Sequence, residues 1–391
     1  MSRQRLAVIV EGMHAFGGTE RQAVDIACGM STRDYDVTLL SRWPIDREHP
    51  LLRELVDHDV RVIPRGWTGA GTGPLQRPHV VASRLVSLGR PSALARHSWR
   101  WEASQLHKLG RATIAHEVPI RGSVAPSGRL VHDRLRVPVV QTILGARPTP
   151  VRAIAPWAVV TSDCSPAMLP ADHPVMWIPT MGPAGEPRPA RVMPTDGHWR
   201  VAFAGRLVEA KGASLLIRAF ASLGANAELT VMGDGEEMAG LVSLASGLDV
   251  AVTFAGRLER RAVLSELERS HVLVVPSLEE DYGEGIPTVI GEALWAGIPI
   301  IATSVGGVER LFDDAAPGWL VAPGDEGALA RALSEAMSAA HAHAAQAAPT
   351  AYERLLCPRA VLDRYQEAYE LAKRAPRNSA FPVEQSGFAG T

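Results

Sequence analysis

Lysine is rare in this chain of 391 residues: Lys108, Lys211 and Lys373 are the only lysines among 40 basic residues. Arginine supplies the other positive charges, and alanine, glycine and proline are abundant, which indicates a GC-rich, actinobacterial type of genome. This bias does not point to a function. It does make each lysine informative, because arginine is the background choice and the two side chains are not interchangeable.

Cysteine and long apolar runs are also scarce. Cys28, Cys164 and Cys357 lie far apart and fit no metal-ligand spacing, so they predict neither a disulfide framework nor a cysteine metal site. No apolar stretch approaches the roughly 20 residues of a membrane-spanning helix. The N-terminal segment has an apolar core too short for a signal peptide. We therefore expect a cytoplasmic protein.

The net charge of −2 gives no overall attraction to nucleic acid, so we expect no nucleic-acid partner. Basic residues do gather in residues 65–111, where Glu102 is the only acidic residue and three tryptophans are interspersed. Three interpretations stay open for this segment. It could be a solvated face, a site for a phosphorylated acceptor, or a peripheral contact with the inner face of a membrane.

The order of predicted elements indicates two α/β domains. Strand-like and helical stretches alternate in both halves of the chain, which predicts parallel, doubly wound sheets. Residues 180–198 are rich in proline and glycine and are typical of a linker. We expect an N-terminal domain at 1–185, a C-terminal domain at 186–350, a helix at 351–374 packing back on the N-terminal domain, and a disordered tail at 375–391.

The first candidate site is the stretch "GRLVEAKG", residues 205–212, which follows a predicted strand. Ligands of open α/β sheets bind beyond the carboxyl ends of the strands. Gly205 would let a ligand approach the backbone closely, and Arg206 and Lys211 place two cations at the start of a helix, an arrangement that suits a diphosphate. An ordinary solvated loop is the alternative, and the rare lysine favours phosphate.

The second candidate site contains two glutamates, Glu284 and Glu292, in "YGEGIPTVIGEALWAG". The pattern predicts a buried helix that begins near Pro287. A carboxylate inside such a helix needs hydrogen-bonding partners, and either a sugar diol or an internal arginine could serve Glu292. Glu284 precedes the helix at a position that would face a ligand, although a carboxylate that only favours the helix dipole is the alternative.

The first half offers weaker signals. Gly17 and Gly18 follow the first strand and would expose backbone N–H groups to an anion, but a tight turn explains the pair equally well. His14 and His116 lie at or near the carboxyl ends of predicted strands. Most of the other histidines are expected on the surface or in the core.

Taken in order, "GRLVEAKG", "VMGDGEE" and "EGIPTVIGEALWAGIPIIATSVGGVERL" resemble the retaining GT-B glycosyltransferases of the family 4 type, over residues 200–335. Glu284 and Glu292 match the E-x7-E pattern of that family. The resemblance implies two Rossmann-like domains facing each other across a cleft. It also implies a nucleoside diphosphate sugar as donor, UDP or GDP for preference, with transfer to a hydroxyl acceptor and no metal or other cofactor.

The resemblance also assigns roles. Glu284, Arg206, Lys211 and His116 would be catalytic, and Glu292 would bind the ribose hydroxyls. The donor-binding set would be Gly17, Gly18, Gly205, Arg206, Lys211, Gly256, Arg257, Gly285, Ile286, Pro287, Thr288 and Glu292.

The chain departs from the family pattern at two places. Leu144 stands where the family often has a histidine, so we expect His116 to replace that contact or the contact to be lost. "IPTMGPAG" replaces the usual "IPNG" continuation. Two alternatives to a transferase for natural-product or cell-envelope glycosides therefore stay open: a phosphorylase or sugar-phosphate synthase of the same fold, and a non-catalytic donor-binding protein.

Overall fold

The computed structural model divides the chain into two compact units. Unit 1 contains Met1–Ser162, Pro166–Ile178 and Leu362–Thr391, and unit 2 contains Asp163–Ser165 and Pro179–Val361. The structure describes residues 3–10, 13, 18–42, 44–68, 104–109, 113–118, 137–143, 159–162, 175–194, 197–223, 226–278, 285–312 and 316–374.

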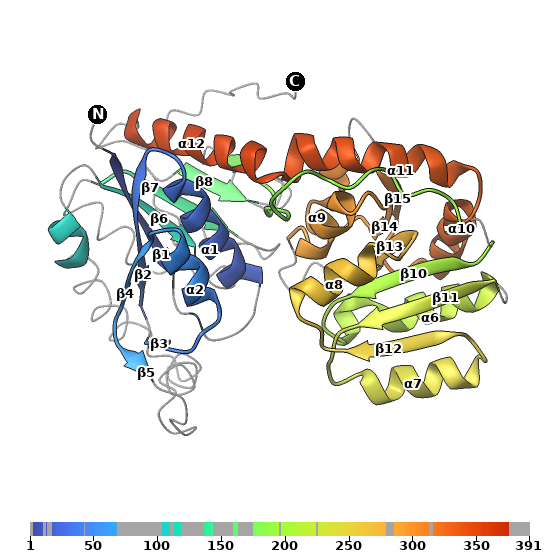
Figure 1. The fold of residues 1–391 in the computed structure, drawn as a ribbon. Helices are drawn as coiled ribbons and strands as arrows, with labels where there is room; N and C mark the ends of the chain where they lie inside the picture. Colours follow the sequence, from blue (N-terminus) through green and yellow to red (C-terminus); the bar gives the residue numbers. More distant parts are fainter. Residues whose placement is uncertain are drawn as a thin grey trace. The chain divides into compact units, whose positions relative to one another are not determined.

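Unit 1 is built on a seven-stranded parallel sheet in the order β4-β2-β1-β6-β7-β8-β9 (Figure 1). A two-stranded sheet of β3 and β5 accompanies it. The strands are β1 (Gln4–Val10), β2 (Tyr35–Ser41), β3 (Ile45–Asp46), β4 (Arg61–Pro64), β5 (Trp67–Thr68), β6 (Thr113–Val118), β7 (Val139–Ile143), β8 (Val159–Ser162) and β9 (Val175–Trp177). Helices α1 (Gly18–Ser31) and α2 (Leu51–Asp57) belong to the same unit.

Burial explains the central strands of unit 1. Leu6 to Val10 of β1 are all buried, and so is every residue of β6. Burial of successive residues along a strand is typical of parallel strands covered on both faces. Val8 pairs in register with Leu39 of β2 on one side and with His116 of β6 on the other.

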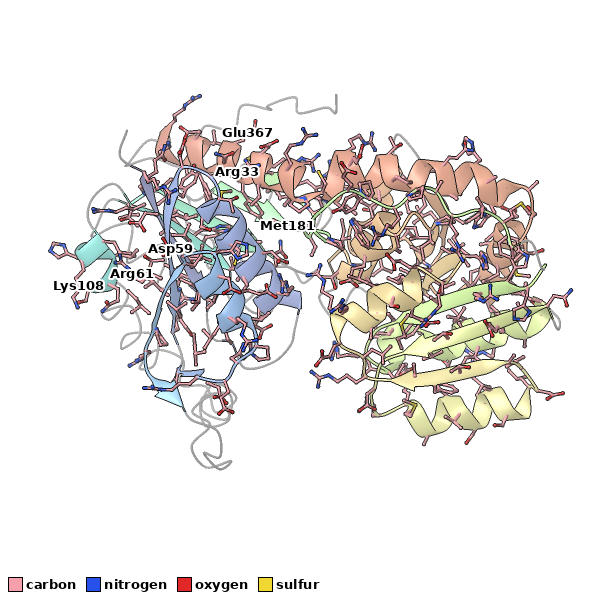
Figure 2. All side chains as sticks on the ribbon, in the orientation of Figure 1. Arg33, Asp59, Arg61, Lys108, Met181 and Glu367 are labelled. Atoms are coloured by element: carbon pink, nitrogen blue, oxygen red, sulfur yellow. The ribbon has the colours of Figure 1, made fainter. Side chains whose placement is uncertain are left out.

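Helix α12 (Pro358–Arg374) supplies a buried polar layer to unit 1. Tyr365 accepts a hydrogen bond from the side chain of Gln22 at 3.1 Å. Both Tyr365 and Tyr369 are fully buried. At the edge of this contact, Arg33 donates to Asp363 at 2.7 Å, and Figure 2 shows Arg33 beside the helix. From Leu362 onward the helix belongs to unit 1.

Unit 2 contains a six-stranded parallel sheet in the order β12-β11-β10-β13-β14-β15. Its strands are β10 (Trp199–Ala204), β11 (Ala227–Met232), β12 (Val252–Gly256), β13 (Val272–Val275), β14 (Ile300–Thr303) and β15 (Gly318–Val321). Its helices are α6 (Ala213–Phe220), α7 (Met238–Gly247), α8 (Arg260–Leu267), α9 (Thr288–Trp295), α10 (Glu326–Ala336) and α11 (Ala340–Ala351), followed by a π-helical turn, Tyr352–Leu356.

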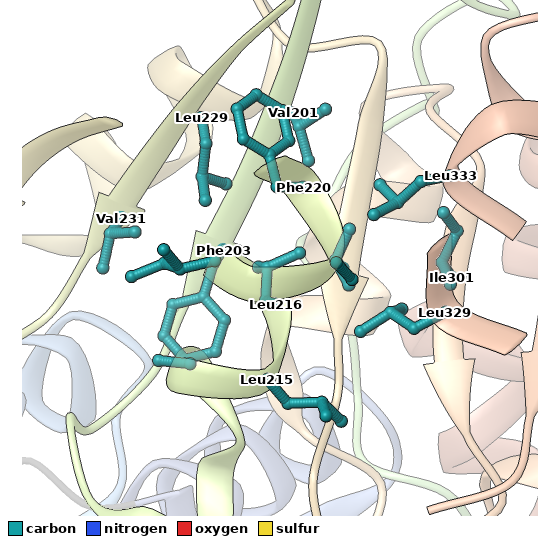
Figure 3. Packing of buried hydrophobic residues seen from close by; sticks show 14 of the residues in the cluster. Val201, Phe203, Leu215, Leu216, Phe220, Leu229, Val231, Ile301, Leu329 and Leu333 are labelled. Carbon is teal, nitrogen blue, oxygen red and sulfur yellow. The ribbon is translucent and has the colours of Figure 1, made fainter. Parts of the chain in front are cut away.

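The core of unit 2 lies between its sheet, α6 and α10. Phe203 and Leu229 of the sheet pack with Leu216 and Phe220 of α6 and with Leu333 of α10 (Figure 3). Both β10 and β13 contribute to this apolar layer, and they are neighbours at the centre of the sheet. The strands that follow β10 along the chain are added on one side of it, and those that follow β13 are added on the opposite side. The two strands therefore flank a topological switch point.

The predicted α/β fold with two doubly wound sheets is confirmed. The chain passes from unit 1 to unit 2 between Ile178 and Pro179, and it returns between Val361 and Leu362. The predicted linker has no helix or strand in its described residues, yet it packs against the rest of unit 2. Met181 is buried, and the backbone N–H of Arg188 donates a hydrogen bond to Trp295 O at 2.7 Å. The predicted tail at 375–391 lies outside the described residues.

Two features are absent from the described residues. None of their helices is both long and apolar enough to cross a membrane. No cluster of three or more His, Cys, Asp or Glu side chains in this part of the chain is arranged to hold a metal ion.

Candidate functional site

The loops at the carboxyl edge of the unit 2 sheet are joined by backbone hydrogen bonds. The Gly205 N–H donates to Met232 O at 3.0 Å, and the Gly233 N–H donates to Gly256 O at 2.8 Å. The Leu278 N–H donates to Ala210 O at 2.8 Å. The loops after β10, β11, β12 and β13 therefore form one connected edge beside the switch point, where ligands of this fold bind.

The loop after β10 carries the two predicted cations. Arg206 is exposed, and Lys211 is half-buried at the end of a short 3-10 turn, Glu209–Lys211. Gly212 follows with φ 68°, and a Cβ there would lie 2.0 Å from Pro276 O of the neighbouring loop. Only glycine fits this close approach, so the turn that positions Lys211 before α6 is fixed by backbone packing.

Gly205 differs from Gly212 because no described atom of the protein requires it to be glycine. The nearest atom to a Cβ at this position would be in the Phe203 ring at 3.5 Å, an ordinary contact. Gly256, after β12, has φ 66° and open space where a Cβ would lie, and Arg257 beside it is exposed. These two loops leave room at the edge that a ligand could fill.

Helix α9 begins as the sequence predicts. Pro287 is its N-cap residue, and Gly297, with φ 73°, follows its end. The first N–H groups of a helix have no acceptor within the helix, which makes its start suitable for an anion. Gly285, Pro287 and Thr288 are half-buried there, and Ile286 is buried.

A small hollow adjoins the start of α9 at the carboxyl ends of β13 and β14. The hydroxyl of Ser277 is buried at this hollow and has no hydrogen-bond partner in the part of the chain that the structure describes. A buried hydroxyl without a partner carries a desolvation cost. The lining residues are Val275, Ser277, Gly285, Pro287, Thr303, Val305 and Val308.

Glu292 has an internal partner. Its side chain is 10% exposed, and its Oε1 accepts a hydrogen bond from Arg260 Nε at 2.9 Å. Arg260, the first residue of α8, was not predicted as a site residue, because nothing in the sequence sets it apart from the neighbouring Arg261. The structure thus realises the internal-arginine alternative for this carboxylate. Glu284 lies outside the described residues.

Few of the predicted site residues of unit 1 lie within the described residues. Gly17, His14 and Leu144 lie outside the described residues, and Gly18 is the first residue of α1.

His116 lies in the core of unit 1 and not at a ligand-accessible edge. The residue is completely buried in β6, its Nδ1 lies 2.8 Å from the Tyr369 hydroxyl, and its Nε2 lies 2.7 Å from Thr142 Oγ1. Burial lowers the pKa of His116 to about 3, so the ring is neutral at physiological pH. The assignment of a catalytic role to His116 is corrected for this reason: both ring nitrogens serve the core.

Sequence patterns gave no sign of a buried ion pair in unit 1. Arg42, just after β2, donates to Glu117 of β6 at 2.9 Å, and Gln141 of β7 donates to the other oxygen of Glu117 at 2.8 Å. The side chains of Arg42 and Glu117 are 5% and 3% exposed. No local pattern could have revealed the pair, because the residues are 75 positions apart in sequence.

The family model described as "Glycosyl transferases group 1" matches residues 191–354, which include most of the edge just described. This region is therefore similar to the group 1 glycosyltransferase family. Two curated proteins show how far the likeness extends. The chain aligns with the amylovoran biosynthesis glycosyltransferase AmsK of Erwinia amylovora at 32% identity over 141 residues, 34% of this chain and 35% of AmsK. The glycogen synthase of Mycobacterium tuberculosis is 26% identical over 357 residues, 81% of each protein.

The chain thus spans about a third of the length of relatives such as AmsK. Among solved structures, that of Anabaena Alr3699/HepE in complex with UDP and glucose matches with a TM-score of 0.66 at 16% identity, covering 94% of this chain and 99% of that one. This likeness confirms the predicted GT-B fold.

Proposed function

We propose that the protein is a retaining glycosyltransferase of the family 4 type that moves a sugar from a nucleoside diphosphate sugar to a hydroxyl acceptor. The observation that supports this proposal best is the connected carboxyl edge of the unit 2 sheet. There Arg206 and Lys211, the open glycine positions and the start of α9 lie on adjoining loops. Such an edge supplies cations and helix N–H groups to a diphosphate.

In this proposal Arg206 and Lys211 bind the diphosphate of the donor, and Gly285 to Thr288 approach it with backbone N–H groups. Glu292 binds the ribose hydroxyls from its place beside Arg260, and Gly256 and Arg257 approach the base. Glu284 faces the sugar. UDP and GDP are the preferred nucleotides, and Alr3699/HepE, which shares the fold, was solved with UDP.

The chemistry follows from charge. As the bond between sugar and diphosphate breaks, negative charge grows on the leaving diphosphate, and preorganised cations stabilise that charge more in the transition state than in the ground state. The leaving diphosphate accepts the proton of the attacking hydroxyl on the same face, so the anomeric configuration is kept. The mechanism that we propose uses no protein nucleophile and no metal.

The first test is a thermal-shift and calorimetric screen of the purified protein against UDP, GDP, ADP and TDP. A nucleotide that binds the folded state raises the melting temperature by mass action, so the preferred base is identified directly. We expect UDP or GDP to give the largest shift. If none of the four nucleotides binds, the donor assignment is wrong.

The second test uses variants in a transfer assay with the sugar of the preferred nucleotide. Lys211→Ala should lower kcat/KM by about 100-fold to 1,000-fold, the usual effect of removing one transition-state charge contact. Glu284→Ala should also lower transfer strongly, and exposed Arg218 on α6 offers a matched control as Arg218→Ala. Transfer at the wild-type rate by both site variants would refute the assignment, and a requirement for free phosphate would favour a phosphorylase.

A further inference from the structure

The segment Thr180–Pro183, which opens unit 2, is packed tightly although it has no helix or strand. Thr180 and Met181 are each 6% exposed. The segment contacts two other parts of unit 2, the start and middle of α9 and the π-helical turn Tyr352–Leu356. It also lies within "IPTMGPAG", where the chain departs from the family pattern. These contacts distinguish the segment from a poorly packed linker.

Thr180 contacts the turn that leads into α9. Its hydroxyl donates a hydrogen bond to the carbonyl of Ile286 at 3.2 Å, and both residues are buried. This carbonyl precedes the helix, whose own bonding starts with Pro287 O accepting from the Ile290 N–H at 3.0 Å. Since the next residue is proline, the peptide unit that contains this carbonyl has no N–H of its own. The Thr180 hydroxyl supplies a side-chain donor to this carbonyl.

Two glycines bring the same segment against the middle of α9. A Cβ on Gly291 would lie 3.1 Å from the Gly182 Cα, and a Cβ on Gly182 would lie 2.6 Å from the Tyr352 ring. The Tyr352 ring is fully buried, and its hydroxyl donates to Pro183 O, so it has little freedom to move aside. The Gly182 N–H donates to Leu356 O at 2.8 Å. The segment is thus held from two sides while it supports the helix that carries Glu292.

We propose that Thr180 is a positioning residue for the donor-binding turn Gly285–Thr288, acting through the carbonyl of Ile286. This inference rests on the proposed function, because it takes that turn to contact the diphosphate of the donor. A hydroxyl that only fills space would leave nucleotide affinity unchanged when a methyl group of the same size replaces it. A hydroxyl that orients the turn would not.

The experiment compares Thr180→Val with Thr180→Ser by calorimetric titration with the nucleoside diphosphate that the wild-type protein prefers among UDP, GDP, ADP and TDP. Valine keeps the shape and removes the donor, whereas serine keeps the donor. Thr230→Val is the matched control, because Thr230 lies on β11 and its hydroxyl donates to Glu266, away from the turn. We expect Thr180→Val to weaken affinity by about 5-fold to 20-fold, the scale of one buried hydrogen bond.

Thr180→Ser and Thr230→Val should both bind within about twofold of wild type, a difference under 0.5 kcal/mol by RT ln 2. Wild-type affinity in Thr180→Val would overturn the proposal, and so would a loss in Thr180→Ser as large as in Thr180→Val. Failure of the wild-type protein to bind any of the four nucleotides would instead refute the proposed function, so the two failures are distinguishable.

A measurement on the wild-type protein keeps the proposal testable if Thr180→Val does not fold. Nucleotide binding should slow hydrogen exchange in the peptide that contains Gly182, because its N–H bonds Leu356 O in the segment that supports the turn. The peptide that contains Thr230 should show no change. Unchanged exchange at Gly182 in the nucleotide-saturated protein would overturn the proposal.

Discussion

The two units share a strand order, but the charged side chains at the carboxyl edges of their sheets differ in exposure. In unit 2, Arg206 and Arg257 on the loops after β10 and β12 are exposed. In unit 1, Arg42 follows β2 and reaches across β1 to Glu117 of β6, and both side chains are almost completely buried. The same fold therefore has exposed arginines at this edge in one unit and a buried ion pair in the other. In the function proposed above, the exposed arginines of unit 2 serve an anionic ligand, whereas the ion pair of unit 1 joins two strands of its sheet.

The largest effect should come from breaking the buried pair of unit 1. Glu117→Ala removes the carboxylate that faces Arg42, and loss of one partner of a buried ion pair costs about 3–5 kcal/mol. Urea unfolding of the variant measures this cost. Asp363→Ala is the control, since the Asp363 side chain is 62% exposed and its pair with Arg33 should contribute less than about 1 kcal/mol. Equal losses in both variants would contradict the contrast between buried and exposed charge.

Substitution of Glu292 tests whether its carboxylate contacts a ligand at the carboxyl edge of unit 2. If its carboxylate binds the ribose, Glu292→Gln should weaken binding of the preferred nucleoside diphosphate by about 10-fold to 100-fold, since a hydrogen bond to a charged group contributes about 1.5–3 kcal/mol. Calorimetric titration measures this. If the carboxylate serves Arg260 alone, nucleotide affinity will be unchanged.

Arg260→Ala is the companion to that variant. The Arg260 side chain is 35% exposed, so solvent screens its pair with Glu292 and its removal should cost less than about 1 kcal/mol of stability. A large loss of stability would show that Arg260 is the main partner that stabilises the carboxylate of Glu292.

The neutral histidine of unit 1 gives a smaller, pH-dependent effect. Burial holds the pKa of His116 at about 3 in the folded protein, below the unfolded value of about 6.5. Between these values the unfolded chain binds a proton that the folded chain does not. The free energy of unfolding should therefore fall as the pH is lowered from 6.5, with a slope from this residue approaching about 1.4 kcal/mol per pH unit.

Urea unfolding at a series of pH values measures that slope. His49 and His341, whose pKa values burial also lowers, add to it in the same direction. Comparison of His116→Gln with His343→Ala, which changes an exposed histidine, isolates the contribution of His116. The slope should decrease only in the first variant, and an equal slope in both would contradict the assignment.

The smallest expected effect on stability is that of Gly205→Ala. Its Cβ would meet only ordinary contacts, so the change should alter the free energy of unfolding by less than about 0.5 kcal/mol. Nucleotide affinity should nevertheless fall, because the methyl group occupies space proposed for the diphosphate. Gly212→Ala is the counterpart: with φ 68° and a carbonyl 2.0 Å away, it should destabilise by about 1–3 kcal/mol or more. Unchanged affinity in Gly205→Ala would argue against a close ligand approach.

The sequence allowed accurate prediction where the signal was local. Buried strands bounded by glycine and proline predicted the sheet of unit 2, and Pro287 and Gly297 predicted both ends of α9. Prediction failed where partners are distant along the chain. Arg260 meets Glu292 across 32 residues, and His116 meets Tyr369 across 253. A histidine near the end of a strand looks the same in sequence whether it faces a ligand or a tyrosine from the last helix.

The return of the chain to unit 1 at Leu362 has a consequence for biosynthesis. The N-terminus of a polypeptide leaves the ribosome first. All of unit 2 therefore emerges before Tyr365 and Tyr369 can reach Gln22 and His116. Until then the β6 histidine lacks the hydroxyl that it meets in the finished core. Unit 1 is therefore first to be translated and last to be completed, and a transcript cut short before codon 362 would yield a finished unit 2 attached to an unfinished partner.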